Sequence, residues 1–320
     1  TAASPATSAA VPATTAQAAA YPVTVADCKG EQLTFDRAPQ RVVTLDPAVT
    51  EIMIQLGLQD RIVGVTLFDT GTSTMWAPTR DVMRTLKVIN DPKVGYPAKE
   101  AVLAQRPDLV VSEYDSAFSA SYGPATRDAW RKLGVATYLT HGGCGDLTVW
   151  HDLSPFYQDV RDLGAIFGVP ERAEALIAGW ESRVAALQAK AKAAGVPDYA
   201  IGTHDGEKEH PGTLGTWSAN ALIELAGSHY AFVDDDHGDT AVSWETFVKR
   251  NPQVIWVITG LGTPAATTEA QLEHDPRVAG VTAVKDRAFV VVDYDDAGES
   301  PRLLDGLEAM VDGLIALQGR

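Results

Sequence analysis

The chain has 320 residues, a length that suits two compact domains, each with a buried core. Its 42 acidic residues outnumber 26 basic ones, which gives a formal net charge of −16. This charge opposes binding to nucleic acid or to an anionic membrane surface and favours neutral or cationic ligands. No apolar run approaches the roughly 18 residues of a membrane span, and no signal-peptide pattern is visible. The sequence therefore predicts a soluble, already processed protein.

Residues 1–20 differ in composition from the rest of the chain. They read TAASPATSAAVPATTAQAAA, without a charge or a large apolar side chain. Such a segment cannot bury a core, so it is predicted to be a disordered tether. A lipid-anchored cysteine upstream of Thr1 would make it a spacer from a membrane, and a plain disordered tail is the alternative.

The only two cysteines are Cys28, in a predicted early hairpin, and Cys144, in a Gly-rich loop. An even pair in an exported chain predicts a disulfide, which would contribute about 4 kcal/mol in the chain-entropy model. Two separately buried thiols are the alternative.

The first lobe is predicted over residues 21–150. Short apolar runs begin at Arg41, Arg61, Asp108 and Val135, and segments of helical period lie between them. Strands alternating with helices are typical of an α/β lobe around a mostly parallel sheet.

A long helical stretch follows at residues 151–195, interrupted only near Gly168 and Pro170. After this interruption the apolar residues keep a helical period. They are Ala173, Leu176, Ile177, Trp180, Val184 and Leu187. A helix of this length at the middle of the chain is predicted to connect two lobes, and an ordinary capping helix is the alternative.

The strand and helix pattern restarts over residues 196–320 and ends in an amphipathic helix from Ser300. The predicted fold class is therefore α/β, with two Rossmann-like lobes of mostly parallel sheets joined by one long α-helix.

Ligands of parallel sheets gather at the carboxyl ends of the strands, so the loops there are the candidate site. Several of these loops carry large aromatic rings, which suit the wall of a site for a bulky organic ligand. Two arginines add forked donors for an anionic group, and a histidine adds an imidazole. The predicted ligand-binding residues are Trp76, Arg80, Tyr114, Phe118, His204, Trp217, Tyr294 and Arg302. Loop packing for the rings and surface ion pairs for the arginines are the alternatives.

Metal and enzyme motifs are weak. The segment THDGEKEHP, from Thr203, is rich in imidazole and carboxylate but matches no rigid template, so no metal site is predicted. Ser218 lacks the surrounding glycines of a nucleophile elbow, and TGLGTP lacks the third glycine of a dinucleotide motif. No enzyme activity and no cofactor are predicted, and a two-lobed α/β enzyme is kept as the competing class.

These segments together resemble the siderophore, haem and cobalamin substrate-binding proteins of bacterial ABC importers, in which one helix links the two lobes. RVVTLDPAVTEIMIQLGLQDRIVGVT is similar to that family's opening strand, helix and strand, and AKEAVLAQRPDLVVSE to its next helix and strand. DLGAIFGVPERAEALIAGW is similar to the start of its connector, and SWETFVKRNPQVIWVIT to its second-lobe core. The resemblance covers nearly everything from Tyr21 onward.

The resemblance implies an extracytoplasmic lipoprotein that works as a monomer with an ABC permease. It implies that one acidic residue per lobe docks onto the permease, and Glu51 and Glu224 are the predicted pair. The predicted cargo is a ferric siderophore that brings its own Fe³⁺, with a neutral or cationic hydroxamate favoured by the acidic chain. Haem and cobalamin are the alternatives, for which His204 offers an imidazole.

Overall fold

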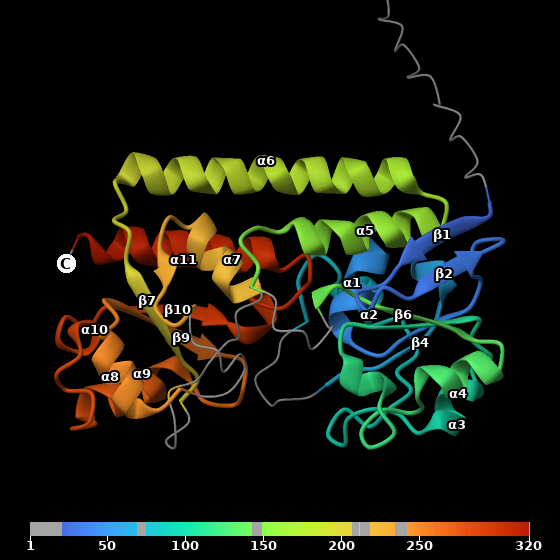
Figure 1. The fold of residues 1–320 in the computed structure, drawn as a ribbon, viewed down its shortest axis with the longest axis horizontal. Coiled ribbons are helices and arrows are strands. Elements are labelled where there is room, and N and C mark those ends of the chain that lie inside the picture. The colour runs from blue at the N-terminus through green and yellow to red at the C-terminus, as the bar shows by residue number, and fades with distance from the viewer. Residues whose placement is uncertain are drawn as a thin grey trace, which may run out of the picture.

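The computed structural model describes residues 21–68, 75–142, 149–206, 211, 218–233 and 242–319. Figure 1 shows two α/β lobes side by side, with the helix α6 (Pro170–Ala194) running along one side of both. The predicted fold class is confirmed.

The first lobe contains a parallel four-stranded sheet in the order β4-β3-β5-β6. Its strands are apolar and buried on both faces, as expected for a parallel sheet covered by helices. An antiparallel hairpin of two strands precedes the sheet. The elements are β1 (Val23–Ala26), β2 (Gln32–Phe35), β3 (Val42–Thr44), α1 (Pro47–Gln55), η1 (Gln59–Arg61), β4 (Ile62–Val65), α2 (Arg80–Met83), α3 (Lys99–Leu103), β5 (Leu109–Ser112), η2 (Asp115–Phe118), α4 (Arg127–Lys132) and β6 (Ala136–Leu139).

The second lobe repeats this design with a parallel sheet in the order β10-β9-β7-β8. The strand β8 was not predicted, because two residues are too few to show a period-two pattern. The elements are β7 (Ala200–His204), α7 (Ser218–Leu225), β8 (His229–Tyr230), α8 (Trp244–Arg250), β9 (Val254–Thr259), α9 (Ala265–His274), α10 (Thr282–Lys285), β10 (Phe289–Asp293), η4 (Tyr294–Asp296) and α11 (Leu303–Leu317).

The connecting stretch is two helices, because the chain breaks between α5 (Ser154–Ile166) and α6. The break falls at Gly168 and Pro170, as the sequence predicts. Pro170 opens α6 and Gly195 closes it with a φ of 71°, which only glycine adopts without strain. Figure 1 shows α6 passing alongside both α5 and α11.

A continuous apolar core joins the lobes through these helices. Trp180 of α6 lies with its ring centroid 5.2 Å from that of Phe156 in α5 and 6.5 Å from that of Tyr157. Further along α6, Val184, Leu187 and Ala191 are buried on the same face of the helix. This packing fixes α6 against both lobes. No helix in the described ranges is both long enough and apolar enough to cross a membrane.

Candidate functional site

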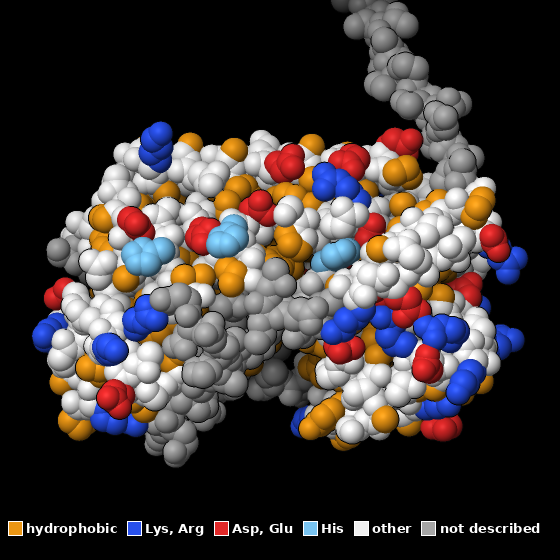
Figure 2. All heavy atoms as spheres, viewed as in Figure 1, with side chains coloured by type: hydrophobic (Ala, Val, Ile, Leu, Met, Phe, Trp, Pro, Cys, Tyr) orange, Lys and Arg blue, Asp and Glu red, His pale blue; other side chains and the backbone are white. Residues whose placement is uncertain are grey.

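The carboxyl edges of the two sheets face each other across the junction between the lobes. Tyr114 follows β5 of the first lobe and Tyr294 follows β10 of the second, and their side chains are neighbours. Figure 2 shows the surface hollowed between the lobes on the side away from α6. The structure therefore places two of the predicted ligand-binding aromatics at one interlobe position.

Asp46 organises the first-lobe side of this junction. It is fully buried directly after β3 and caps α1, where its Oδ1 accepts a hydrogen bond of 2.9 Å from Val49 N. Its Oδ2 accepts from Glu113 N at 2.6 Å and from Ser112 Oγ at 3.1 Å. Burial raises the pKa of Asp46 to about 6, although these hydrogen bonds partly counteract burial. One carboxylate thus joins the ends of two neighbouring strands.

Two glutamates that the sequence did not single out meet between the lobes. Glu113 and Glu299 are 3 % and 6 % exposed, and Glu299 N donates to Glu113 Oε1 at 3.3 Å. Ser218 Oγ donates to Ala297 O at 2.5 Å and to Glu299 Oε1 at 3.3 Å. Glutamates in acidic loops carry no sequence signal for such a meeting, because the two residues are far apart in the chain.

The phenols around this pair lie in an environment that disfavours negative charge. Burial raises the pKa of Tyr294 to about 12 and that of Tyr96 to about 12, and acidic neighbours add to the effect. The pKa of Tyr114 is raised in the same way, by burial first and then by Glu113. Carboxyl groups and neutral phenols therefore line the junction, an arrangement that favours a neutral or cationic ligand group.

Arg302 is not available in the predicted way as an anion partner. Its side chain is 9 % exposed and pairs with Asp296 Oδ1 at 2.8 Å and Asp295 Oδ2 at 3.3 Å. Burial lowers the pKa of Arg302, but these carboxylates more than reverse that effect and raise it overall. Arg302 therefore matches the alternative interpretation, in which the arginine forms ion pairs with carboxylates of the protein itself.

Glu51 lies close to Arg302 and is 3 % exposed, which does not fit its predicted role as a surface residue that docks onto a permease. The reason is that α1 turns this side chain toward the second lobe and not toward solvent. Burial raises the pKa of Glu51 to about 8, against the lowering effect of Arg302.

Trp76 connects the first lobe to the second. Its Nε1 donates to Oδ2 of Asp305 in α11 at 2.7 Å, and Arg183 of α6 donates to Oδ1 of the same carboxylate at 2.7 Å. A residue predicted to contact ligand is thus part of a contact among the first lobe, the connector and the second lobe.

Replacing Trp76 with phenylalanine is expected to lower the free energy of unfolding by about 1–2 kcal/mol, because a hydrogen bond to a carboxylate is lost while most of the ring is kept. Urea denaturation of Trp76→Phe, Asp305→Asn and the double variant measures the coupling between the two residues. Fully additive effects would show that the hydrogen bond contributes nothing.

Three other predicted ligand-binding residues contact partners other than the two tyrosines. Arg80 is exposed and pairs with Asp81 at 3.4 Å. Phe118 is buried in the first-lobe core, with the Arg127 guanidinium 5.9 Å from its ring centroid. His204 is 2 % exposed, with its ring centroid 5.4 Å from that of Trp244. Trp217, the eighth predicted residue, lies outside the described residues.

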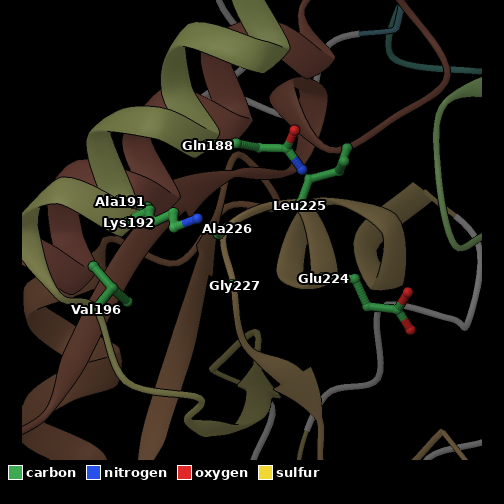
Figure 3. A pocket seen from close by; sticks show the side chains of 8 residues that line it. All are labelled: Gln188, Ala191, Lys192, Val196, Glu224, Leu225, Ala226 and Gly227. Atoms are coloured by element: carbon green, nitrogen blue, oxygen red, sulfur yellow. The ribbon is translucent and has the colours of Figure 1, made fainter.

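Glu224, the second predicted docking residue, lies at the end of α7. Its carboxylate binds His151 Nδ1 at 2.9 Å and accepts from Asn220 Nδ2 at 2.9 Å. Figure 3 shows it at the rim of an open pocket of about 270 Å³ between α6 and α7, with its carboxylate directed away from Lys192. Its side chain is 33 % exposed, so it remains accessible to a partner.

Sequence reasoning also missed a histidine at the end of β6. His141 Nδ1 lies 2.8 Å from Asp159 Oδ1, and Tyr138 OH donates to the same carboxylate at 2.8 Å. Burial lowers the pKa of His141, but Asp159 reverses this and raises it overall. This network fastens α5 to the first-lobe sheet.

The sequence predicts no metal site and one disulfide. Across the described ranges, no group of three or more His, Cys, Asp and Glu side chains is arranged to hold a metal ion. Residues 207–210 of the THDGEKEHP segment lie outside these ranges. Cys28 is not a free thiol, and its pairing with Cys144 stays a prediction because Cys144 lies outside the description.

Two α/β lobes joined by one long helix, with candidate site residues at their junction, are the architecture of two-lobed solute-binding proteins. The model of the periplasmic binding protein family matches residues 42–295, and the chain belongs to this family. It is a substrate-binding component of ABC transport and not an enzyme.

Individual relatives agree with this membership. An uncharacterized ABC transporter substrate-binding lipoprotein, YvrC of Bacillus subtilis, is 28% identical over 92% of this chain and 86% of its own length. A cobalamin-binding protein of Halobacterium salinarum is 27% identical over 92% of this chain and 75% of its own length. The crystal structure of an ABC-type Fe³⁺-hydroxamate transport system from Saccharomonospora viridis superimposes with a TM-score of 0.72 at 23% identity, covering 92% of this chain and 99% of that one.

Proposed function

We propose that the protein binds a ferric siderophore of the hydroxamate class between its lobes and delivers it to an ABC permease outside the cytoplasm. In this proposal residues 1–20 are a tether to a lipid anchor at the membrane, an arrangement supported by the likeness to a substrate-binding lipoprotein. The iron is part of the cargo and needs no resident metal site.

The observation that carries the proposal is the lining of the interlobe junction. Tyr114 and Tyr294 meet there beside Glu113, Glu299 and Asp46, so aromatic surface and acidic groups share one place. Phenol rings pack against the organic shell of a chelate, and the acidic groups disfavour a strongly anionic one. A neutral or cationic hydroxamate chelate fits this lining better than a triply charged catecholate.

Cobalamin is the second candidate cargo, and the observation that favours it is the similarity to the cobalamin-binding protein of Halobacterium salinarum. Its corrin would use the same aromatic lining, while the buried position of His204 offers little access to an axial imidazole. Haem ranks third among the candidate ligands, because the buried His204 offers it equally little access to an axial imidazole.

Fluorescence titration is expected to select among these ligands, because the chain contains seven tryptophans. A ferrioxamine-type chelate should quench the emission at submicromolar concentration, whereas a catecholate chelate, cobalamin and haem should not. Tyr114→Phe and Tyr294→Phe should each weaken binding by about tenfold, because each removes a hydroxyl at the junction.

Tyr122→Phe is the matched control, since Tyr122 is 77 % exposed in the first lobe. Its affinity should equal that of the unaltered protein. Selective quenching by cobalamin would show that cobalamin, and not a hydroxamate chelate, is the cargo. No response to any of the four ligands would contradict binding of a chelate altogether.

A further inference from the structure

Glu113 and Glu299 form a direct carboxyl pair between the lobes. Glu113 follows β5 of the first lobe, and Glu299 lies between β10 and α11 of the second. Besides the bond from Glu299 N to Glu113 Oε1, the neighbouring Glu299 carboxyl group raises the pKa of Glu113. Two buried carboxyl groups at this interlobe contact favour a proton on one of the two.

The packing around the pair leaves little freedom for either side chain. A Cβ atom at Gly142, which follows β6, would lie 2.1 Å from Cγ of Glu299. The Glu299 side chain therefore lies directly against first-lobe backbone, and a larger residue at position 142 would require that side chain to move. Separation of the lobes would remove Glu299 from both Glu113 and Gly142.

The groups that face the pair supply no compensating cation in the described part of the chain. The largest effects on Glu113 come from burial, from Glu299 and from Asp46 at the start of α1, and together they raise its pKa well above the usual range. Tyr96, Tyr114 and Tyr294 also face the pair as neutral phenols, while Ser218 donates to Glu299. These surroundings favour a single negative charge on two carboxyl groups.

We propose that Glu113 and Glu299 form a proton-dependent latch that holds the two lobes together. With one proton shared, the pair is a hydrogen bond between the lobes. When that proton leaves for solvent, two buried carboxylates face each other, and their repulsion favours separation of the lobes. The latch concerns lobe closure and does not depend on which chelate is carried.

The test is lobe separation in the full chain without ligand, measured by energy transfer between dyes. The dyes are attached through non-canonical amino acids at Tyr122 in the first lobe and Leu261 in the second, which are 77 % and 44 % exposed, so that both cysteines stay untouched. The ratio of open to closed molecules should rise as the pH increases above the ordinary range of a carboxyl pKa, by up to about tenfold per pH unit, as release of one proton requires.

Glu299→Gln supplies an amide donor that no longer titrates, so this variant should stay closed across the whole pH range. Glu113→Gln should also stay closed at every pH, and it serves as the second variant if Glu299→Gln does not fold. Glu171→Gln, which alters an exposed carboxylate on α6, should retain the response of the unaltered protein.

Energy transfer that does not change with pH in the unaltered protein would overturn the latch. The same pH response in Glu299→Gln or Glu113→Gln would overturn it as well. Neither result bears on chelate binding, which the fluorescence titration tests separately.

Discussion

Replacing Asp46 with alanine is expected to lower the free energy of unfolding by about 2–4 kcal/mol. The change removes the cap of α1 and leaves the buried Glu113 N–H without its acceptor, while the Ser112 hydroxyl keeps the Tyr114 carbonyl as an acceptor. Loss of a helix cap costs about 1 kcal/mol, and the unsatisfied buried donor adds about 1–3 kcal/mol. Urea denaturation followed by circular dichroism measures the difference.

Two control variants separate these contributions. Asp46→Asn keeps one acceptor oxygen for the cap and should cost clearly less than alanine. Thr126→Ala removes a half-buried cap that only accepts from Ala129 N at 3.3 Å, so it should cost about 1 kcal/mol. Equal costs for Asp46→Ala and Thr126→Ala would show that Asp46 acts only as a helix cap.

Replacing Glu51 with glutamine is expected to change how stability depends on pH. The pKa of Glu51 is about 8 in the folded protein, mainly because of burial, and about 4.5 is the ordinary value that the unfolded chain should show. A carboxyl group whose folded pKa is raised stabilises the folded state fully below about pH 4.5. That contribution is lost as the pH rises toward about 8.

Glutamine keeps the shape of the side chain and does not titrate. The variant should therefore match the unaltered protein near pH 4 and exceed its free energy of unfolding by roughly 4–5 kcal/mol near pH 9. Arg302 does not need the Glu51 charge, because it already pairs with Asp295 and Asp296. Urea denaturation at three pH values measures the difference between the two proteins.

Glu100→Gln is the control for this comparison, since Glu100 is an exposed acid on α3. Its stability should follow that of the unaltered protein at every pH. Parallel stability curves for Glu51→Gln and the unaltered protein would mean that Glu51 is already ionised in the folded state.

The burial of Glu51 also bears on how the protein meets its permease. The first-lobe contact must be made by another acidic side chain if docking uses one such residue per lobe. Glu224 keeps a partly exposed side chain and remains the proposed contact of the second lobe.

The sequence by itself determined the two lobes, the connector and the family. Alternating apolar runs and helical periods depend on neighbouring residues, so the strands after Arg41, Arg61 and Asp108 could be placed within one or two positions. The break at Gly168 and Pro170 was equally visible, because both residues act on the local backbone.

Only the tertiary structure decided which loop residues meet. Glu113 and Glu299 are separated by more than half of the chain, and Trp76 and Asp305 by still more. No local pattern encodes such contacts, since they depend on how two lobes pack against one helix. For the same reason the sequence could not distinguish Tyr114 and Tyr294, which meet between the lobes, from Phe118, whose ring lies in the core.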